Sequence, residues 1–501
     1  MTSVDTSSPP ARANAGAGQS SLSSDGRYVA FSSASSNLVS VGNHATTQIY
    51  KRDLLTGATE LVSVVPAGAD SGDKPSTDPS ISADGRFVAF TSRATNLTLP
   101  ADLTNSFSQV YVRDTTGGLT RKLSLTPGLV LGGNENSNTP SISADGSLVA
   151  FQSGANNLVN GLTPTTYQVY LASNAVDPMV RLVSARNGTA SGLPDGAAVQ
   201  PSISGDGATV VFVSGSSDLA GVSGAGNGQI YARSLATATT RLLTLDRSNA
   251  SVAGDNASGE PVVSFDGSRV AYTSKASNLV PQPLGSATQI LLFDRATGQN
   301  SLVSAALVSG NGASGESKQP SISADGQKVV FPSTPGNLSS TPANGFEQVF
   351  LRDLVTATTR MVSTLPGLPI SGCLEDCFDA SLSADARFVA FTSNSPGLSA
   401  TPATGGFLQT YVRSLVAEEP TPTPSATAPM PPTGGTVTPV ATQEAVVAGQ
   451  GGSGPTRGRL ASTGVSPMQI LAAGLGGAML ALVGGSVLYG SGHVRSRRSR
   501  A

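Results

Sequence analysis

The stretch PSISADGRFVAFTS, from Pro79 to Ser92, decides the fold of this chain. Two short β-prone runs, Ser80–Ser82 and Phe87–Phe90, flank the dipeptide Asp84-Gly85. Asp-Gly between two such runs is a strong hairpin signal, because glycine adopts a positive φ angle without steric cost. The stretch therefore predicts an antiparallel β-hairpin.

The hairpin recurs along the chain with a period of about 60 residues. The turn aspartates of the successive copies are Asp25, Asp84, Asp145, Asp206, Asp266, Asp325 and Asp385. A fixed long period is typical of stacked or radially arranged units. It takes precedence over the several ordinary domains that a chain of 501 residues would otherwise suggest.

Each copy also contains a second hairpin, whose first strand begins with glutamine about 24 residues after the turn aspartate. In the first copy this strand runs from Gln48 to Asp53, and Leu61-Val62-Ser63 follows a Thr-Gly turn. The equivalent glutamines are Gln48, Gln109, Gln168, Gln229, Gln289, Gln348 and Gln409. Two hairpins give four strands per copy. The sequence therefore predicts an all-β, seven-bladed propeller of four-stranded blades, whose radial closure protects the sheet edges.

The two ends of the repeat region complement one another. No fourth strand follows Arg413-Ser414-Leu415, whereas Met1–Val4 resembles the internal strand Leu61–Val64. We expect Met1–Val4 to complete the last blade and close the ring. Since Met1–Gly18 contains no apolar segment of the kind a secretory signal needs, we also expect the natural start, with an export signal, to lie upstream.

The copies resemble the WD40-like repeats of TolB-type propellers, often called PD40, whose core reads roughly P-x-x-S-P-D-G-x-x-I-A-F. Ala83 stands where that pattern has proline. The resemblance covers about residues 1–416 and implies the propeller architecture. It does not imply one function, because this fold serves as scaffold, receptor and enzyme accessory domain alike.

Composition excludes several classes of site. The net charge is −2, and removing the terminal arginines leaves −6, so the body lacks the clustered basic face that nucleic-acid binding needs. The only two histidines, His44 and His493, complete neither a nucleophilic triad nor a zinc set. The absence of tryptophan argues against a sugar-binding aromatic platform. We expect no catalytic residue, cofactor or metal, and we interpret the acidic segments 70–78 and 255–260 as solvated turns rather than calcium loops.

The repeated polar residues have structural interpretations. Each turn aspartate is expected to cap its own turn. Each repeated glutamine is expected to bond to neighbouring backbone, as a buried amide must. A ring of these glutamines around a ligand tunnel remains the alternative.

The last 85 residues form a spacer and an anchor. Residues 417–459 are rich in Pro, Thr and Gly, a composition that predicts a disordered spacer. A transmembrane helix is predicted over about 468–489, where 22 residues carry no charge. The basic end that follows places the C-terminus in the cytoplasm and the propeller outside.

This tail resembles the cell-wall sorting signal of Gram-positive bacteria. The motif consists of Leu460, Ala461, Ser462, Thr463 and Gly464. The resemblance implies cleavage by a sortase between Thr463 and Gly464 and transfer of the propeller to peptidoglycan. Ala461 replaces the commoner proline, as in the LAxTG variant. An ordinary single-pass membrane anchor remains the alternative.

Cys373 and Cys377 are the only cysteines, and outside the cell we expect them to form a disulfide. A loop so short contributes roughly 2 kcal/mol in the chain-entropy view.

We expect a non-enzymatic surface protein that binds a protein or glycan. The alternatives are a secreted or surface hydrolase or lyase that uses the propeller face, and a structural wall component without a specific ligand. Carboxylates that converge at one mouth of the central channel would favour the enzyme, whereas a flat apolar patch would favour partner binding.

Overall fold

The computed structural model describes residues 13–40, 46–68, 70–99, 106–128, 131–222, 225–334, 336–340, 344–399 and 406–415. The chain divides into two units, Met1–Thr423 and Pro424–Ala501, and every described residue belongs to the first. The predicted closing strand Met1–Val4, both histidines, the spacer and the whole sorting signal lie outside the described residues.

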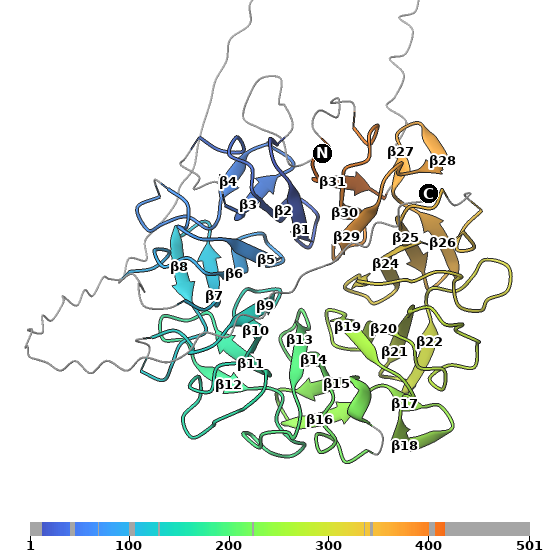
Figure 1. The fold of residues 1–501 in the computed structure, drawn as a ribbon, viewed down its shortest axis with the longest axis horizontal. Helices are drawn as coiled ribbons and strands as arrows, with labels where there is room; N and C mark the ends of the chain where they lie inside the picture. Colours follow the sequence, from blue (N-terminus) through green and yellow to red (C-terminus); the bar gives the residue numbers. More distant parts are fainter. Residues whose placement is uncertain are drawn as a thin grey trace, which may run out of the picture. The chain divides into compact units, whose positions relative to one another are not determined.

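The described strands form seven antiparallel sheets arranged as blades around a central axis (Figure 1). Blade 1 contains β1 (Ala17–Leu22), β2 (Tyr28–Ser33), β3 (Gln48–Asp53) and β4 (Thr59–Leu61). Blade 2 contains β5 (Ser76–Ile81), β6 (Phe87–Ser92), β7 (Gln109–Asp114) and β8 (Leu119–Lys122). Blade 3 contains β9 (Ser137–Ile142), β10 (Leu148–Ser153), β11 (Gln168–Ser173) and β12 (Val180–Leu182).

Blade 4 contains β13 (Ala198–Ile203), β14 (Thr209–Ser214), β15 (Gln229–Ser234) and β16 (Thr239–Leu242). Blade 5 contains β19 (Ser258–Val263), β20 (Arg269–Ser274), β21 (Gln289–Asp294) and β22 (Gln299–Leu302). Blade 6 contains β23 (Ser321–Ile322), β24 (Lys328–Ser333), β25 (Gln348–Asp353) and β26 (Thr358–Met361). Blade 7 contains three described strands, β29 (Cys377–Leu382), β30 (Phe388–Ser393) and β31 (Gln409–Ser414). The prediction of an all-β, seven-bladed propeller is confirmed for the described unit.

Three elements interrupt the repeat. The hairpins β17 (Leu245–Asp246) with β18 (Asn249–Ala253) and β27 (Thr364–Leu365) with β28 (Leu368–Gly372) lie in the links that follow blades 4 and 6. A short 3-10 helix, η1 (Ala225–Asn227), precedes β15. The sequence repeat does not predict these elements, because they occupy links between the periodic strands.

The second strand of each blade is buried on both faces. In β6, every residue from Val88 to Ser92 is buried, which explains the continuous apolar run in the sequence. Phe90 stacks on Tyr111 of β7, with ring centroids 5.8 Å apart. The Tyr111 hydroxyl donates to the backbone oxygen of Ala94 at 3.2 Å. Such cross-strand aromatic pairs hold the blade together.

The repeated turn, which is Asp-Gly in six blades and Asp385-Ala386 in blade 7, has the same hydrogen bonds in all seven blades. In blade 2, the Ser82 hydroxyl donates to Asp84 Oδ1 at 2.6 Å and accepts from the Phe87 amide at 2.9 Å. Asp84 Oδ1 also accepts from the Arg86 amide at 2.9 Å. The seven turn aspartates named above all take this position. Their carboxylates therefore cap the turn backbone.

Backbone hydrogen bonds between successive turns link every blade to the next. The Ala83 amide donates to the Ala144 carbonyl at 2.9 Å, and Ala144 donates to Gly205 at 2.9 Å. The Asp385 amide donates to the Ser24 carbonyl at 3.1 Å, which joins blade 7 to blade 1. The described ring is therefore closed at its turn end by peptide groups alone.

The turn glycine is required for packing between blades as well as for its backbone angle. Gly85 has φ +75°, and a Cβ there would collide with the ring of Tyr28 in the preceding blade. Gly68 has a similar φ of +73°, but a Cβ at this position would meet no atom within 4 Å.

We expect Gly85→Ala to lower the free energy of unfolding more than Gly68→Ala. Both variants incur a left-handed backbone cost of about 1 kcal/mol. Only Gly85→Ala adds overpacking against Tyr28, which we expect to cost a further 1–3 kcal/mol or so. Chemical denaturation of both variants measures the difference. Equal losses would mean that Tyr28 moves aside freely and that this junction is not tightly packed.

Candidate functional site

The innermost strand of each blade carries an irregularity next to the central axis. In β5 the register shifts between Thr77 and Ser80, so that two residues bulge out of the ladder. The first bulge residue has a φ between 46° and 54° in blades 2 to 7. The seven residues at this position, which we call the axial ring, are Gln19, Asp78, Thr139, Gln200, Glu260, Gln319 and Asp379.

Proline follows the axial ring residue in five blades. These prolines are Pro79, Pro140, Pro201, Pro261 and Pro320. A proline at the bulge has no amide hydrogen that needs a ladder partner. Together the ring and the residues that follow it line a channel of about 380 Å³.

Hydrogen bonds between blades orient several side chains of the axial ring. Gln200 Oε1 accepts from the Glu260 amide at 3.0 Å, and Glu260 Oε2 accepts from the Gln319 amide at 2.7 Å. Gln19 Oε1 accepts from the Asp78 amide at 3.1 Å. The ring therefore has an organised set of amide and carboxylate groups.

Two hydroxyl groups that line the channel lack hydrogen-bond partners. Ser20 Oγ and Thr139 Oγ1 are buried and bond to no described residue. Buried polar groups in proteins are nearly always bonded, so each exception calls for an explanation.

Acidic groups gather at one side of the ring, between blades 6 and 7. Lys318 Nζ lies 3.1 Å from a carboxylate oxygen of the buried Glu347. Burial raises the pKa of Glu347, while the Lys318 charge opposes the rise and the carboxylates of Asp376 and Asp379 add to it. Burial also raises the pKa of Asp379, against a hydrogen bond from Gln319 and the charge of Lys318.

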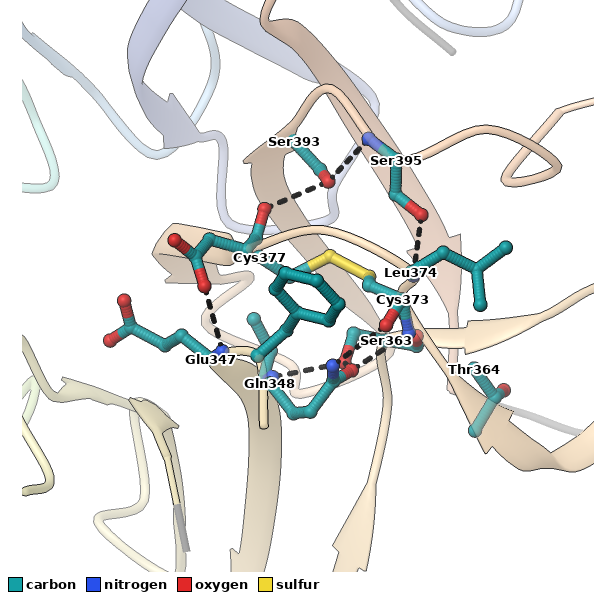
Figure 2. The surroundings of a disulfide bond; sticks show 12 residues. Glu347, Gln348, Ser363, Thr364, Cys373, Leu374, Cys377, Ser393 and Ser395 are labelled. Atoms are coloured by element: carbon teal, nitrogen blue, oxygen red, sulfur yellow. Dashed lines mark hydrogen bonds between the residues drawn. A yellow bond between two sulfur atoms is a disulfide. The ribbon is translucent and has the colours of Figure 1, made fainter. Parts of the chain in front are cut away.

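The predicted disulfide lies beside this acidic group (Figure 2). Cys373 and Cys377 are joined, with their Cα atoms 6.5 Å apart, and both are buried. The Cys377 amide donates to the Glu347 carbonyl at 2.9 Å. The Cys373 carbonyl accepts from Gln348 Nε2 at 3.0 Å, and the Cys373 amide donates to Gln348 Oε1 at 2.8 Å. The disulfide loop therefore fixes the strand start that carries Glu347.

The repeated glutamines of the third strands do not line the channel. In blade 2, Gln109 is 1% exposed; its Nε2 donates to the Gly133 carbonyl at 2.9 Å, and its Oε1 accepts from the Ser124 hydroxyl at 2.5 Å. The same pattern recurs in blades 1 to 6. These amides tie the end of a blade to the link that follows it. The glutamines that do line the channel belong to the axial ring.

The segments considered for calcium have other roles. Asp73 accepts from the Thr95 amide at 2.8 Å and from its hydroxyl at 2.7 Å, and Asp255 accepts from the Ser277 amide at 2.7 Å. Each carboxylate thus ties two loops together. Within the described ranges, no three His, Cys, Asp or Glu side chains gather closely enough to hold a metal ion. The same ranges contain no helix with the length and apolar character needed to cross a bilayer.

Two features of this site have a signal in the sequence. The axial ring residue precedes Pro-Ser-Ile in four of the seven blades, and it is the variable polar position before that tripeptide. Glu347 precedes Gln348 where the other repeats have no charged residue. Neither signal is sufficient to predict the site, because the sequence repeat does not show the bulge that turns these positions toward the axis.

No family profile matches the chain, and no curated protein matches it significantly. Among solved structures, TolB from Acinetobacter baumannii shares 18% identity over 67% of this chain and 63% of that chain, with a TM-score of 0.38. An oligogalacturonate lyase from Vibrio parahaemolyticus shares 13% over 83% and 92%, with a TM-score of 0.46.

A structure of prolyl endopeptidase shares 13% identity over 83% of this chain and 51% of that chain, with a TM-score of 0.47. The chain thus spans less than two thirds of the TolB and prolyl endopeptidase chains. At these identities and TM-scores the likeness concerns the propeller fold alone, and it decides nothing about function.

We expect Asp379→Asn to raise the free energy of unfolding near pH 7 and to leave it nearly unchanged near pH 3. Burial raises the folded-state pKa of Asp379 above the unfolded value, so the folded protein binds more protons in the window between the two pKa values. Stability therefore falls as pH rises through that window, and asparagine removes this cost. Denaturation at several pH values measures the effect.

The control is Asp177→Asn at an exposed position, which should change stability little at either pH. If Asp379→Asn instead destabilised the protein near neutral pH, the contacts of this carboxylate with Gln319 and Lys318 would outweigh the cost of its burial.

Proposed function

We propose that this chain is a non-enzymatic binding module displayed at the cell surface, and that the axial ring binds a polar ligand, either a protein segment or a glycan. The observation that carries the proposal is the axial ring itself, in which hydrogen bonds between blades orient the side chains of Gln19, Gln200 and Glu260 along one channel.

The backbone at the ring supports the same proposal. Thr139 has φ 49°, and a β-branched residue in this region is a genuine outlier. Strained positions of this kind persist where the surrounding structure enforces them, and they cluster at binding sites. Here the bulge turns amide, hydroxyl and carboxylate groups toward one axis, and these groups suit a ligand rich in hydroxyl or amide groups.

The second candidate is a hydrolase or lyase that acts at the same mouth. It is favoured by Glu347 and Asp379, two carboxylates whose pKa values are raised by burial. Acid–base chemistry near neutral pH needs carboxylates shifted in this direction. The binding module is preferred because the three carboxylates of the ring stand in separate blades, namely blades 2, 5 and 7.

We expect the purified chain to retain one class of polar ligand on an array of immobilised oligosaccharides and oligopeptides, and Asp78→Ala to weaken that binding about 10-fold. Asp78 lines the channel and is only partly buried, and its carboxylate accepts from the neighbouring Thr77 hydroxyl at 3.2 Å, so the variant should stay folded. Loss of one ligand hydrogen bond accounts for an effect of this size.

The matched control is Asp177→Ala, which removes an exposed carboxylate that does not line the channel. It should bind as the wild type does. Retention of nothing on the array would favour the structural wall component. Release of shortened oligosaccharides, abolished by Glu347→Gln, would favour the enzyme.

We also propose that the tail attaches this module to the envelope. The support is the order of the LASTG motif Leu460–Gly464, the uncharged run 468–489 and the basic end. In this proposal residues 1–416 form the displayed propeller and 417–459 the spacer. A sortase acts at Thr463, the propeller is joined to peptidoglycan, and before cleavage the tail spans the membrane.

We expect muralidase digestion of the cell wall to release the wild-type protein, and Thr463→Ala to shift it into the detergent-extracted membrane fraction. Replacing Thr463 removes the threonine side chain of the motif that the sortase would recognise, while the apolar run stays intact. Ser453→Ala in the spacer is the matched control and should behave as the wild type. Recovery of the wild type in membranes alone would leave the ordinary membrane anchor.

A further inference from the structure

A second pocket lies between blades 4 and 5, at the turn end of the propeller. Its walls include the apolar side chains of Leu242, Leu243, Val270 and Phe293, and its volume is about 110 Å³. Gly267 of the blade 5 turn also lines it. The pocket is distinct from the axial channel, with which it shares no lining residue.

The pocket exists because two residues of the repeat are small at this junction. The first residue of the second strand packs against the turn glycine of the next blade, as Tyr28 does against Gly85 and Phe87 does against Gly146. The residues at this position are Tyr28, Phe87, Leu148, Thr209, Arg269, Lys328 and Phe388. Thr209 is the smallest of them, and it lines the pocket.

The second small residue is Ala232, at the fourth position of β15. The equivalent residues in the seven blades are Lys51, Val112, Leu171, Ala232, Leu292, Leu351 and Val412. Between blades 1 and 2, Lys51 Nζ donates to the Gly85 carbonyl at 3.1 Å and lies 4.9 Å from the Tyr28 ring centre. Thr209 and Ala232 therefore leave open a space that Tyr28 and Lys51 fill elsewhere.

The charge at this junction is also different. Between blades 1 and 2, Lys51 pairs with Glu60 at 2.7 Å. The residue equivalent to Glu60 at the pocket is Arg241. Arg295 follows Asp294, whose carboxylate faces Arg269 at 3.3 Å.

Arg241 and Arg295 both line the pocket. Neither guanidinium group pairs with a side chain anywhere in the described ranges. The pocket thus combines apolar walls with two positive groups that no neighbouring carboxylate neutralises.

We propose that this pocket binds a small monocarboxylate with one compact apolar group. The apolar group occupies the space left by Thr209 and Ala232, and the carboxylate accepts from Arg241 and Arg295. Arginine is the residue best suited to bind a carboxylate through paired hydrogen bonds. An apolar cavity of about 150 Å³ holds benzene. At about 110 Å³ this pocket is smaller, so it accommodates no more than one compact group, such as a single ring or a branched alkyl group.

The pocket has a way in from solvent. Leu245 and Gly298 line both this pocket and a more polar groove of about 570 Å³ beside the hairpin β17–β18. The groove therefore connects with the pocket at these two residues. This inference does not depend on the function proposed for the axial ring.

The test is titration of the purified full-length chain with phenylacetate, followed by calorimetry. We expect saturable binding of one molecule per chain. Phenylacetamide, which has the same shape without the charge, should bind at least about 10-fold more weakly. Arg241→Ala and Arg295→Ala should each weaken phenylacetate binding by a similar factor, because each removes one charge-assisted contact.

Thr209→Phe introduces at this junction the phenylalanine that blade 2 has at the equivalent position, Phe87. The larger side chain should fill the pocket and abolish binding. Arg181→Ala, the equivalent of Arg241→Ala in blade 3, is the matched control and should leave binding unchanged. If Thr209→Phe does not fold, as judged by its thermal transition, the two arginine variants decide. Equal binding of phenylacetamide, unchanged binding in both arginine variants or no saturable binding at all would overturn the proposal.

Discussion

The structure depends on one repeated contact, the hydrogen bond from the backbone of one Asp-Gly turn to the backbone of the next. These bonds run from Ala83 to Ala144, from Ala144 to Gly205 and on to the closing bond from Asp385 to Ser24. Hydrogen bonds from its own serine and aspartate stabilise each turn, as those of Ser82 and Asp84 do in blade 2. Because these contacts use peptide groups and a constant Ser-x-Asp motif, they set the positions of the blades without restricting the residues around them.

This division of roles explains where the chain varies. The axial ring residues differ from blade to blade, although six of them, in blades 2 to 7, share the same positive φ angle at the axis. The residues packed between blades also differ, from the ring of Tyr28 to the small side chain of Thr209. Substitution at either position changes a channel or a junction and leaves the turn contacts intact. The shapes of the channel and of each junction are therefore set by single residues at repeated positions.

Much of the fold could be predicted from the sequence, because it depends on local signals. The Asp-Gly turn specifies a hairpin, and the buried amide of Gln109 marks the start of each third strand. The ring of bulges could not be predicted. Residues such as Thr139 and Glu260 carry no preference for positive φ, and only the sheet enforces that angle on them. The surroundings of Glu347 and Asp379 and the pocket beside Thr209 depend on which residues of neighbouring blades come into contact. The periodicity of the sequence does not specify those contacts.

The disulfide next to the channel mouth makes the shape of that mouth sensitive to thiol reductants. Cys373 and Cys377 close the link between blades 6 and 7, and their backbone groups bond to Gln348 and Glu347 (Figure 2). Thiol reductants would open that covalent link and loosen one sector of the mouth, while the turn contacts at the opposite end of the blades would persist. The protein would then stay folded but present a less ordered rim, so the shape of this mouth depends on the disulfide staying oxidised.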